Sequence, residues 1–226
     1  MHRRTHGLIA AASILSLACS SGAPPRTGVT LAPGAGVATT ISEATRVALV
    51  TADSAARAFA PADVEFMQGM VPHHAQAIRM AGWAETHGAR ADVKLLSARI
   101  LVAQTDEIRM MRRWLADRRQ EVPDSMAMRH VMTMNGMRHE MMMPGMLTDE
   151  EMAALDAARG SAFDRLFLTG MIRHHQGAIE MVYTLLSHGN AGHDDTVFRF
   201  ANDVVSDQSA EITLMYRMLE TVPPLQ

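Results

Sequence analysis

Residues 66–80 read FMQGMVPHHAQAIRM, and residues 167–181 read FLTGMIRHHQGAIEM. The two stretches align without gaps, and eight of their 15 positions are identical, including a Gly-Met step and two adjacent histidines. A second pattern, Gln-x-x-Glu-Ile-x-x-Met, follows each stretch and starts at Gln104 and at Gln208. Such self-similarity indicates that the chain contains two copies of one structural unit.

Apolar residues recur with helical spacing through both copies, and the alternation typical of strands is scarce. The sequence predicts helices at residues 61–87, 91–119, 148–159, 161–188 and 195–220, and an extra N-terminal helix within residues 39–60. The two helical hairpins, residues 61–122 and 148–226, are each too thin to bury an apolar stripe alone. We therefore expect an all-α fold in which the two hairpins form one four-helix bundle.

The histidine pairs fall on the helix faces that should point into the bundle. At about 100° per residue, Met70 shares one face with His73 and His74. The second copy repeats this face with Met171, His174 and His175. Imidazole and thioether groups are ligands that a late first-row metal selects. These six residues are therefore candidate metal ligands, the histidines before the methionines.

Each second helix carries a glutamine and a glutamate on its apolar stripe. They are Gln104 and Glu107 in the first copy, and Gln208 and Glu211 in the second. A carboxylate on a core-facing stripe costs on the order of several kcal/mol unless it is paired or ligated. We expect each Gln–Glu pair to meet a histidine pair across its hairpin. There it could orient the imidazoles through their second ring nitrogen, or bind metal directly.

A purely structural interpretation of these residues stays open. Methionines on a helix stripe are more often gap-filling core residues than ligands. An inward histidine is often a core residue that is satisfied by a hydrogen bond. Two adjacent histidines, repeated with a methionine one turn before, favour metal binding over this alternative.

The linker between the hairpins, residues 123–147, is exceptionally rich in methionine. Residues 126–146 contain nine methionines and two histidines: Met126, Met128, His130, Met132, Met134, Met137, His139, Met141, Met142, Met143 and Met146. A polar segment punctuated by glycine and proline is expected to give these thioethers no face to bury. Such spacing resembles thioether sites for monovalent copper or silver, because Cu(I) is soft and accepts few, uncharged ligands. The alternative is a disordered, oxidisable linker.

The first 38 residues read as an export signal followed by a tether. Residues 1–18 combine a basic start with a short apolar run, which predicts a signal peptide. Cys19 follows in a context that resembles a bacterial lipobox, so we expect lipidation there; an ordinary signal with an incidental cysteine is the alternative. Residues 19–38 are rich in Ser, Gly, Pro and Ala and predict a flexible tether. The protein is thus expected at the periplasmic face of a bacterial envelope, held by its lipid alone.

The composition excludes several classes of function. Cys19 is the only cysteine, so neither an internal disulfide nor a zinc site of several thiolates can form. The net charge is −3 with both signs present, which disfavours nucleic acid as a partner.

The repeated Gly-Met-x-x-His-His-x-x-Ala-Ile-x-Met pattern, followed by Gln-x-x-Glu-Ile-x-x-Met, resembles the domain of unknown function 305 (DUF305) family. The segment MPGMLTDEEM at residues 143–152 resembles it too, and the likeness extends over about residues 63–219. The resemblance implies a ferritin-like four-helix bundle, exported in bacteria, and its copper-binding members imply periplasmic copper handling. Both histidine pairs match the family motif. Pro72 matches its usual Pro-His-His, whereas Arg173 departs from it, so the two halves could differ in affinity.

Together, these features predict a non-enzymatic, extracytoplasmic protein that sequesters or relays copper, with Cu(I) favoured and Cu(II) or silver as alternatives. The first rival is a structural envelope module, whose histidines would only form hydrogen bonds. The second is a dinuclear iron or manganese oxidase, whose bundle uses a glutamate from two helices and Glu-x-x-His from the other two. Each hairpin here has one stripe-facing glutamate and no Glu-x-x-His on its histidine helix, which disfavours the oxidase. The sequence leaves a protein partner and a homo-oligomer open.

Overall fold

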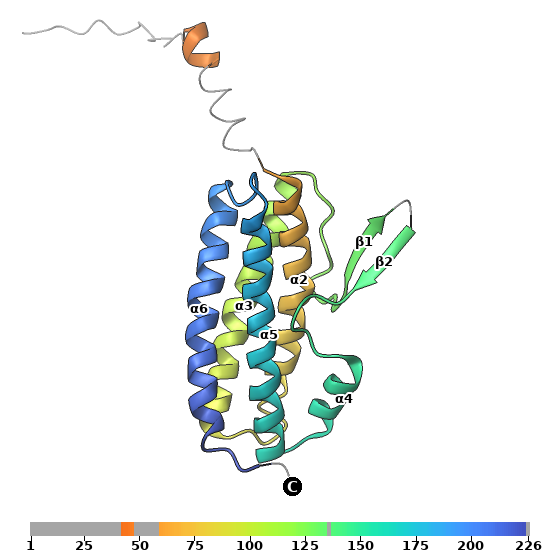
Figure 1. The fold of residues 1–226 in the computed structure, drawn as a ribbon, viewed down its shortest axis with the longest axis vertical. Helices are drawn as coiled ribbons and strands as arrows, with labels where there is room; N and C mark the ends of the chain where they lie inside the picture. The colour runs from red at the N-terminus through yellow and green to blue at the C-terminus, as the bar shows by residue number, and fades with distance from the viewer. Residues whose placement is uncertain (1–41, 48–58, 135–136, 225–226) are drawn as a thin grey trace, which may run out of the picture. The chain divides into compact units, whose positions relative to one another are not determined.

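The computed structural model describes residues 42–47, 59–134 and 137–224. Four long helices run side by side in a bundle (Figure 1): α2 (Pro61–Gly82), α3 (Ala91–Asp117), α5 (Ser161–Ser187) and α6 (Asp195–Leu219). A short helix, α4 (Asp149–Ala157), and two strands, β1 (His130–Met134) and β2 (Met137–Met141), lie beside the bundle. The described chain is mostly helical, which confirms the main part of the all-α prediction.

The N-terminal predictions fall mainly outside the described residues. These are the signal peptide at residues 1–18, the lipidated Cys19 and the tether at residues 19–38. Of the predicted helix within residues 39–60, residues 43–47 are described and are helical. None of the helices in the described ranges is long and apolar enough to cross a membrane.

The helix ends agree with the predicted ones to within two residues, apart from the C-terminal end of α2. We expected that helix to reach residue 87, but it ends at Gly82. The backbone N–H of Trp83 donates to Met80, and that of Ala84 to Ala81, so a tighter turn replaces the α-helix. Gly88 then adopts a φ of 71°, a left-handed conformation that favours glycine. Apolar spacing continues through the turn, which is why the sequence pattern overextends the helix.

The two hairpins meet along α2 and α5, where glycines let methionines of the opposite hairpin approach. A Cβ atom on Gly69 of α2 would lie 3.3 Å from the Met181 methyl group of α5. The equivalent Cβ on Gly170 of α5 would lie 3.3 Å from the Met80 methyl group of α2. Met80 and Met181 occupy equivalent places in the repeat. The methionine of each hairpin therefore packs against the glycine of the other hairpin. These two methionines are core residues, as the structural alternative proposed.

Two buried aspartates also join the hairpins. Asp63, in the first turn of α2, accepts hydrogen bonds from the backbone N–H of Ala60 at 2.8 Å and of Gly192 at 2.6 Å. Asp164, in the first turn of α5, accepts one from the backbone N–H of Arg90 at 3.2 Å. Each aspartate therefore holds the loop of the opposite hairpin. Burial raises the pKa of Asp164.

Two apolar clusters fill the bundle, one toward each end. Members of the first include Phe66, Met70, Met111, Leu115, Val182 and Phe200. Members of the second include Met80, Ile100, Phe163, Phe167, Met171 and Met215. On α5, His174 and His175 lie between Ile172 of the second cluster and Ala178 of the first, and on α2, His73 and His74 lie between Met70 of the first cluster and Met80 of the second, close to the limit of the first.

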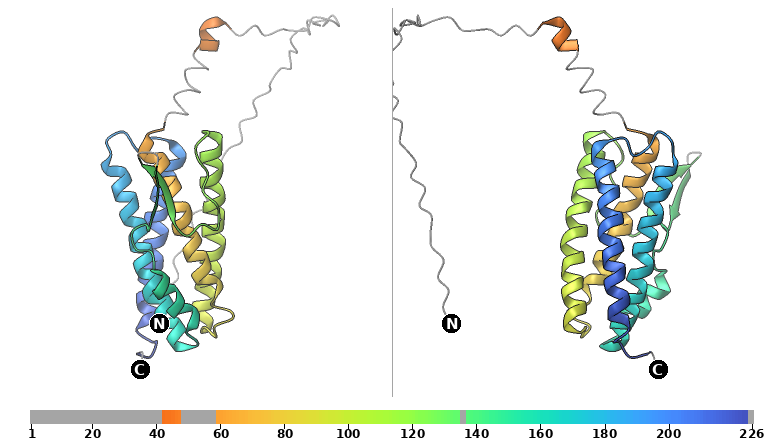
Figure 2. Two further views of the ribbon diagram at one scale, coloured as in Figure 1. Left: turned by 90° about the vertical axis from the view of Figure 1, so that its right-hand side faces the viewer. Right: turned by 60° about the vertical axis from the view of Figure 1, so that its left-hand side comes forward.

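The methionine-rich linker forms an antiparallel hairpin of β1 and β2, which the sequence analysis did not predict (Figure 2). Its register pairs His130 with Met141 and Met134 with Met137. Residues 130–134 include the β-branched Val131 and Thr133, and an Asn-Gly dipeptide follows at 135–136. That dipeptide between two short strand-like runs is a strong hairpin signal, and the abundance of methionine obscured it. The alternative of a disordered linker, left open by the sequence, is therefore wrong for residues 130–134 and 137–141.

Candidate metal centre

The four histidines of the repeat form a layer across the middle of the bundle. His73, His74, His174 and His175 each have 0% of their surface exposed. The His73 and His174 rings face each other across α2 and α5, with centroids 3.8 Å apart and planes inclined by 40°. Within each pair the ring centroids are 6.2 and 6.3 Å apart. Adjacent residues point about 100° apart on a helix, so one histidine of each pair faces the other hairpin and one its own second helix.

The second histidine of each pair binds the glutamate that the repeat places opposite it. His74 Nε2 lies 2.8 Å from Glu107 Oε2, and His175 Nε2 lies 2.8 Å from Glu211 Oε2. An ionised carboxylate only accepts hydrogen bonds, so Nε2 of each ring carries the proton. In the uncharged ring Nδ1 then carries a lone pair, and neither Nδ1 has a hydrogen-bond partner among the described residues. Of the expected meeting of each Gln–Glu pair with a histidine pair, the bond from the glutamate to the second histidine is found, and no hydrogen bond from the glutamine to a histidine is seen among the described residues.

The ring nitrogens of the inner pair, His73 and His174, together make only one hydrogen bond among the described residues. His73 Nε2 lies 3.0 Å from the Pro144 carbonyl oxygen, which can only accept, so this ring also carries its proton on Nε2. Its Nδ1 has no partner, and neither ring nitrogen of His174 has one within the described part of the chain. Five buried ring nitrogens thus lack a hydrogen bond, although burial of an unpaired polar atom is costly.

Burial also keeps the inner pair uncharged. Desolvation, aided by the neighbouring histidines, lowers the pKa of His73 to about 3. The same causes lower the pKa of His174 well below its usual range. Both rings are therefore neutral at neutral pH, which is the state in which imidazole binds a metal.

These donors fit a metal that accepts imidazole nitrogen. In the described residues, no three side chains of His, Cys, Asp or Glu already converge as a metal-holding group. Coordination at the histidine layer would therefore need small rotations of the rings, or a thioether as a further ligand. The unpartnered nitrogens supply the lone pairs, and the Glu107 and Glu211 carboxylates hold the outer two rings.

One side of the histidine layer is covered by residues 143–147, which we call the strap. Gln76 binds the strap twice: its Nε2 donates to the Leu147 carbonyl at 2.9 Å, and its Oε1 accepts from the Leu147 N–H at 2.7 Å. On α5, Gly177 packs directly against the backbone of the strap. A Cβ atom added to Gly177 would lie 2.7 Å from the Gly145 Cα and would collide with Pro144. The strap is therefore fixed to both hairpins at the level of the histidines.

Gln76 is not among the candidate site residues of the sequence analysis. It is buried, because the strap covers its side of α2. The signal was present in the repeat itself. Gln76 aligns with Gly177, so the two copies differ where one binds the strap and the other makes room for it.

The two candidate methionine ligands are buried but lie away from each other. Met70 belongs to the apolar cluster at one end of the bundle, and Met171 belongs to the cluster at the other. Both have 0% of their surface exposed. They therefore flank the histidine layer from opposite sides, and their role as ligands stays a prediction.

The linker candidates are spread over several environments. Met126 is exposed and Met128 half-buried, with the Met128 sulfur accepting from Arg79 Nη1 at 3.4 Å. Met132 and Met134 belong to β1, while the exposed Met137, His139 and Met141 belong to β2. His130 is buried with no partner for Nδ1, and burial lowers its pKa. Met142 and Met143 are half-buried and Met146 is buried, so the expectation that the linker offers no face to bury is wrong at its C-terminal end.

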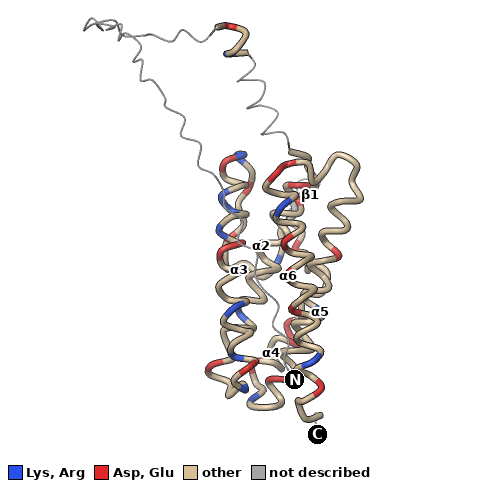
Figure 3. Tube along the Cα trace, turned by 90° about the vertical axis from the view of Figure 1, so that its left-hand side faces the viewer, with Lys and Arg blue, Asp and Glu red and all other residues tan. Residues whose placement is uncertain are grey.

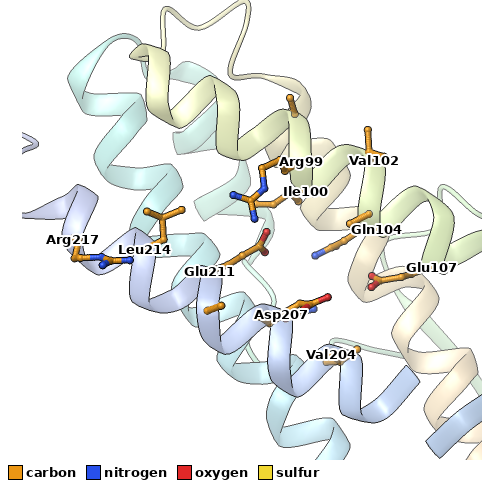
Figure 4. A pocket seen from close by; sticks show the side chains of 14 residues that line it. Arg99, Ile100, Val102, Gln104, Glu107, Val204, Asp207, Glu211, Leu214 and Arg217 are labelled. Atoms are coloured by element: carbon orange, nitrogen blue, oxygen red, sulfur yellow. The ribbon is translucent and has the colours of Figure 1, made fainter. Parts of the chain in front are cut away.

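The side of the bundle formed by α3 and α6 contains a cleft of about 710 Å³. Its walls include the glutamates that bind the outer histidines, and Figure 4 shows Gln104 and Glu107 across the gap from Asp207 and Glu211. Gln104 and Gln208 are only 3% and 5% exposed, and their Oε1 atoms have no hydrogen-bond partner in the part of the chain that the structure describes. Acidic and basic residues both occur along α3 and α6, so this side has no uniform charge (Figure 3).

The sequence model of a domain of unknown function, DUF305, matches residues 63–219, which include the hairpins, the linker and all four histidines. The chain belongs to the DUF305 family. The resemblance expected from the histidine-pair motif is thereby confirmed. No protein with curated annotation matches the chain in sequence.

Solved DUF305 structures share the fold. A DUF305 protein of Streptomyces coelicolor, described as secreted, is 28% identical with a TM-score of 0.59, over 70% of this chain and 92% of its own. CopM in its Cu(I)-bound form is 28% identical with a TM-score of 0.54, over 70% of this chain and 95% of its own. CopM in its Cu(II)-bound form is 31% identical with a TM-score of 0.55, over the same shares. CopM was also solved with bound silver.

Proposed function

We propose that this protein binds copper outside the cytoplasm, sequestering or relaying the ion without catalysing a reaction. The observation that carries the proposal is the buried layer of four imidazoles, in which five ring nitrogens have no hydrogen-bond partner among the described residues. A metal that takes up these lone pairs would remove the cost of leaving them unpaired.

Copper fits this donor set better than harder metals do. Imidazole nitrogen suits both oxidation states of copper, and thioether sulfur suits Cu(I) and silver. The similarity to CopM, solved in Cu(I)-, Cu(II)- and silver-bound forms, supports the same ions here. Oxygen-preferring ions such as Mg²⁺ would not use these lone pairs.

Within the proposed site, the residues have distinct roles. His174 is the first ligand we name, because both its ring nitrogens are unpartnered, and His73, His74 and His175 would bind through Nδ1. Glu107 and Glu211 hold their histidines, with Gln104 and Gln208 beside them. Met70 and Met171 are the next candidate ligands, and the linker methionines would capture soft ions.

We further propose that the bundle is ferritin-like and arose by duplication of one hairpin. The repeated His–Glu bonds, the exchanged methionine–glycine contacts and the exchanged aspartate bonds support this. Lipid attachment through Cys19 at the periplasmic face is part of the proposal, and the secreted relative is consistent with an exported protein.

A metal-free structural bundle is the second candidate function. The two His–Glu hydrogen bonds favour it, because they satisfy part of the polar layer without any metal. It offers no account of the remaining ring nitrogens, which is why we rank it below copper binding.

The test is a competition for Cu(I) between the purified protein and a chromophoric chelator. We expect the unaltered protein to withhold copper, and a variant with His73, His74, His174 and His175 all changed to Ala to withhold far less while keeping its helix content. His193→Ala is the matched control, because His193 is exposed in the loop before α6. Failure of the unaltered protein to compete would support the structural bundle. Copper binding that survives the quadruple change but is lost on deleting residues 126–146 would move the site to the linker.

A further inference from the structure

The four histidines of the layer are fully buried, so an ion must reach them from a side of the bundle, either past the strap or through the cleft between α3 and α6. Apolar clusters fill both ends. The strap covers one side, held by Gln76 and in contact with Gly177. The cleft between α3 and α6 differs, because its walls include Glu107 and Glu211, which directly bind His74 and His175.

The cleft is lined by oxygen donors, with no sulfur or imidazole in its walls. Its polar residues are Arg99, Gln104, Glu107, Asp207, Gln208, Glu211 and Arg217. Three carboxylates outnumber two guanidinium groups, which favours a cation over an anion. Figure 4 labels all of these side chains except Gln208, on the two facing helices around the gap.

The two glutamines point to a ligand independently of the carboxylates. Gln104 and Gln208 are more than nine-tenths buried, line the cleft, and have amide oxygens with no hydrogen-bond partner. They occupy equivalent places in the repeat, so the same buried, unpaired amide oxygen lies beneath each wall of the cleft. A buried amide oxygen without a partner is costly, and a passing cation would satisfy it.

We infer that the cleft between α3 and α6 is the route by which Cu(II) reaches the buried histidines, passing the amide groups of Gln104 and Gln208 and the carboxylates of Glu107 and Glu211, which bind the outer imidazoles directly. Carboxylate and amide oxygens followed by imidazole are ligands that suit Cu(II). The strap side carries thioethers instead, at Met143 and Met146, which suit monovalent ions. The inference rests on the proposed function, and it separates two oxidation states by the side of the bundle they use.

The experiment fills the cleft without changing any proposed ligand. Ala103 and Ala210 are exposed residues that line it from α3 and α6. The variants are Ala103→Phe, Ala210→Phe and the double change. Ala116→Phe is the matched control, because Ala116 is exposed on the same helix as Ala103 but outside the cleft. Circular dichroism checks that each variant keeps its helices.

The readout is the amount of bound metal at successive times after mixing with Cu(II) or Ag(I). Excess chelator stops each reaction, and the desalted protein is analysed for metal. We expect the double variant to bind Cu(II) about tenfold more slowly, since filling the cleft raises the barrier to passage, and to reach the same final content. Its Ag(I) rate should match that of the unaltered protein, and Ala116→Phe should be normal for both ions.

Two results would overturn the inference while leaving copper binding intact. One is an unchanged Cu(II) rate in the folded double variant. The other is an equal slowing of Cu(II) and Ag(I). If the unaltered protein retains neither ion at equilibrium, the proposed function itself fails and the route fails with it. If the double variant does not fold, Gln104→Leu with Gln208→Leu replaces it, and that variant should slow Cu(II) alone.

Discussion

At the scale of single residues, adjacent histidines acquire different environments from one helical geometry. His74 and His175 point toward their own hairpins and bind glutamates, whereas His73 and His174 point toward each other. The partner of each Nε2 then decides where the proton sits. Three of the four rings therefore present Nδ1 as the unpartnered nitrogen.

The lowered pKa values of His73 and His174 predict that the metal-free protein loses stability in mild acid. The unfolded chain protonates these histidines near pH 6.5, whereas the folded protein holds the pKa of His73 at about 3. Their contribution is thus complete above pH 6.5 and is lost as the pH falls from 6.5 toward 3. We expect the free energy of unfolding to decrease by on the order of 1–3 kcal/mol per pH unit below 6.5.

Urea unfolding of chelator-treated protein between pH 7.5 and pH 5 measures this loss, in a range where most carboxylates stay ionised. His174→Leu should flatten the dependence, since it removes one of the two buried titrating rings. His193→Ala, which changes an exposed histidine, should retain it. A free energy of unfolding that stays constant over this range would contradict the buried, neutral state of the pair.

At the scale of elements, the strap makes the two hairpins unequal. Gln76 on α2 binds its backbone, and Gly177, at the equivalent place on α5, admits it. The inner histidines differ in the same way. The Pro144 carbonyl accepts a hydrogen bond from His73, whereas His174 has no such partner among the described residues. The strap therefore turns a repeated sequence into an asymmetric site.

We predict that Gly177→Ala destabilises the protein, because the added methyl group would collide with the backbone of Pro144. The expected loss is about 1–3 kcal/mol of unfolding free energy, as for other overpacked sites, with faster proteolysis within the strap. Gly82→Ala is the control, since a Cβ there meets nothing within 4 Å. That helical change should stabilise by about 0.5–1 kcal/mol. Equal stability of Gly177→Ala and the unaltered protein would show that the strap does not lie against α5.

At the scale of the whole molecule, the two hairpins hold each other's loops. Asp63 binds the loop before α6, and Asp164 binds the loop before α3. Each hairpin therefore relies on the other for a hydrogen bond to its loop. We expect the two hairpins to unfold together, as one cooperative unit.

We predict that Asp63→Ala destabilises the protein more than Asp164→Ala. Asp63 satisfies two backbone N–H groups and Asp164 one, and each buried N–H left unpaired costs about 1–3 kcal/mol. Asp195→Ala should change the free energy of unfolding little, since Asp195 is exposed in the first turn of α6. Thermal and urea unfolding check this order. Equal effects at Asp63 and Asp195 would show that the bonds between hairpins contribute nothing.

The sequence alone determined the helical class, the helices of the bundle and the meeting of each histidine pair with the glutamate of its own hairpin. These follow from periodicity and repetition, which act between residues close along the chain or at equivalent places in two copies. The β1–β2 hairpin also had a local signal, in its Asn-Gly dipeptide, that methionine content masked.

Only the tertiary structure decided which nitrogens of the histidine layer lack partners and which sides of that layer are covered. The Pro144 contact with His73, the Gln76 contact with Leu147 and the cleft between α3 and α6 all join residues distant in sequence. Hydrogen bonding at a buried ring depends on the one atom that arrives within about 3 Å, and helical spacing does not specify that atom. The repeat therefore predicted which rings would be buried, and the packing of the strap and α3 against them determined what each ring can bind.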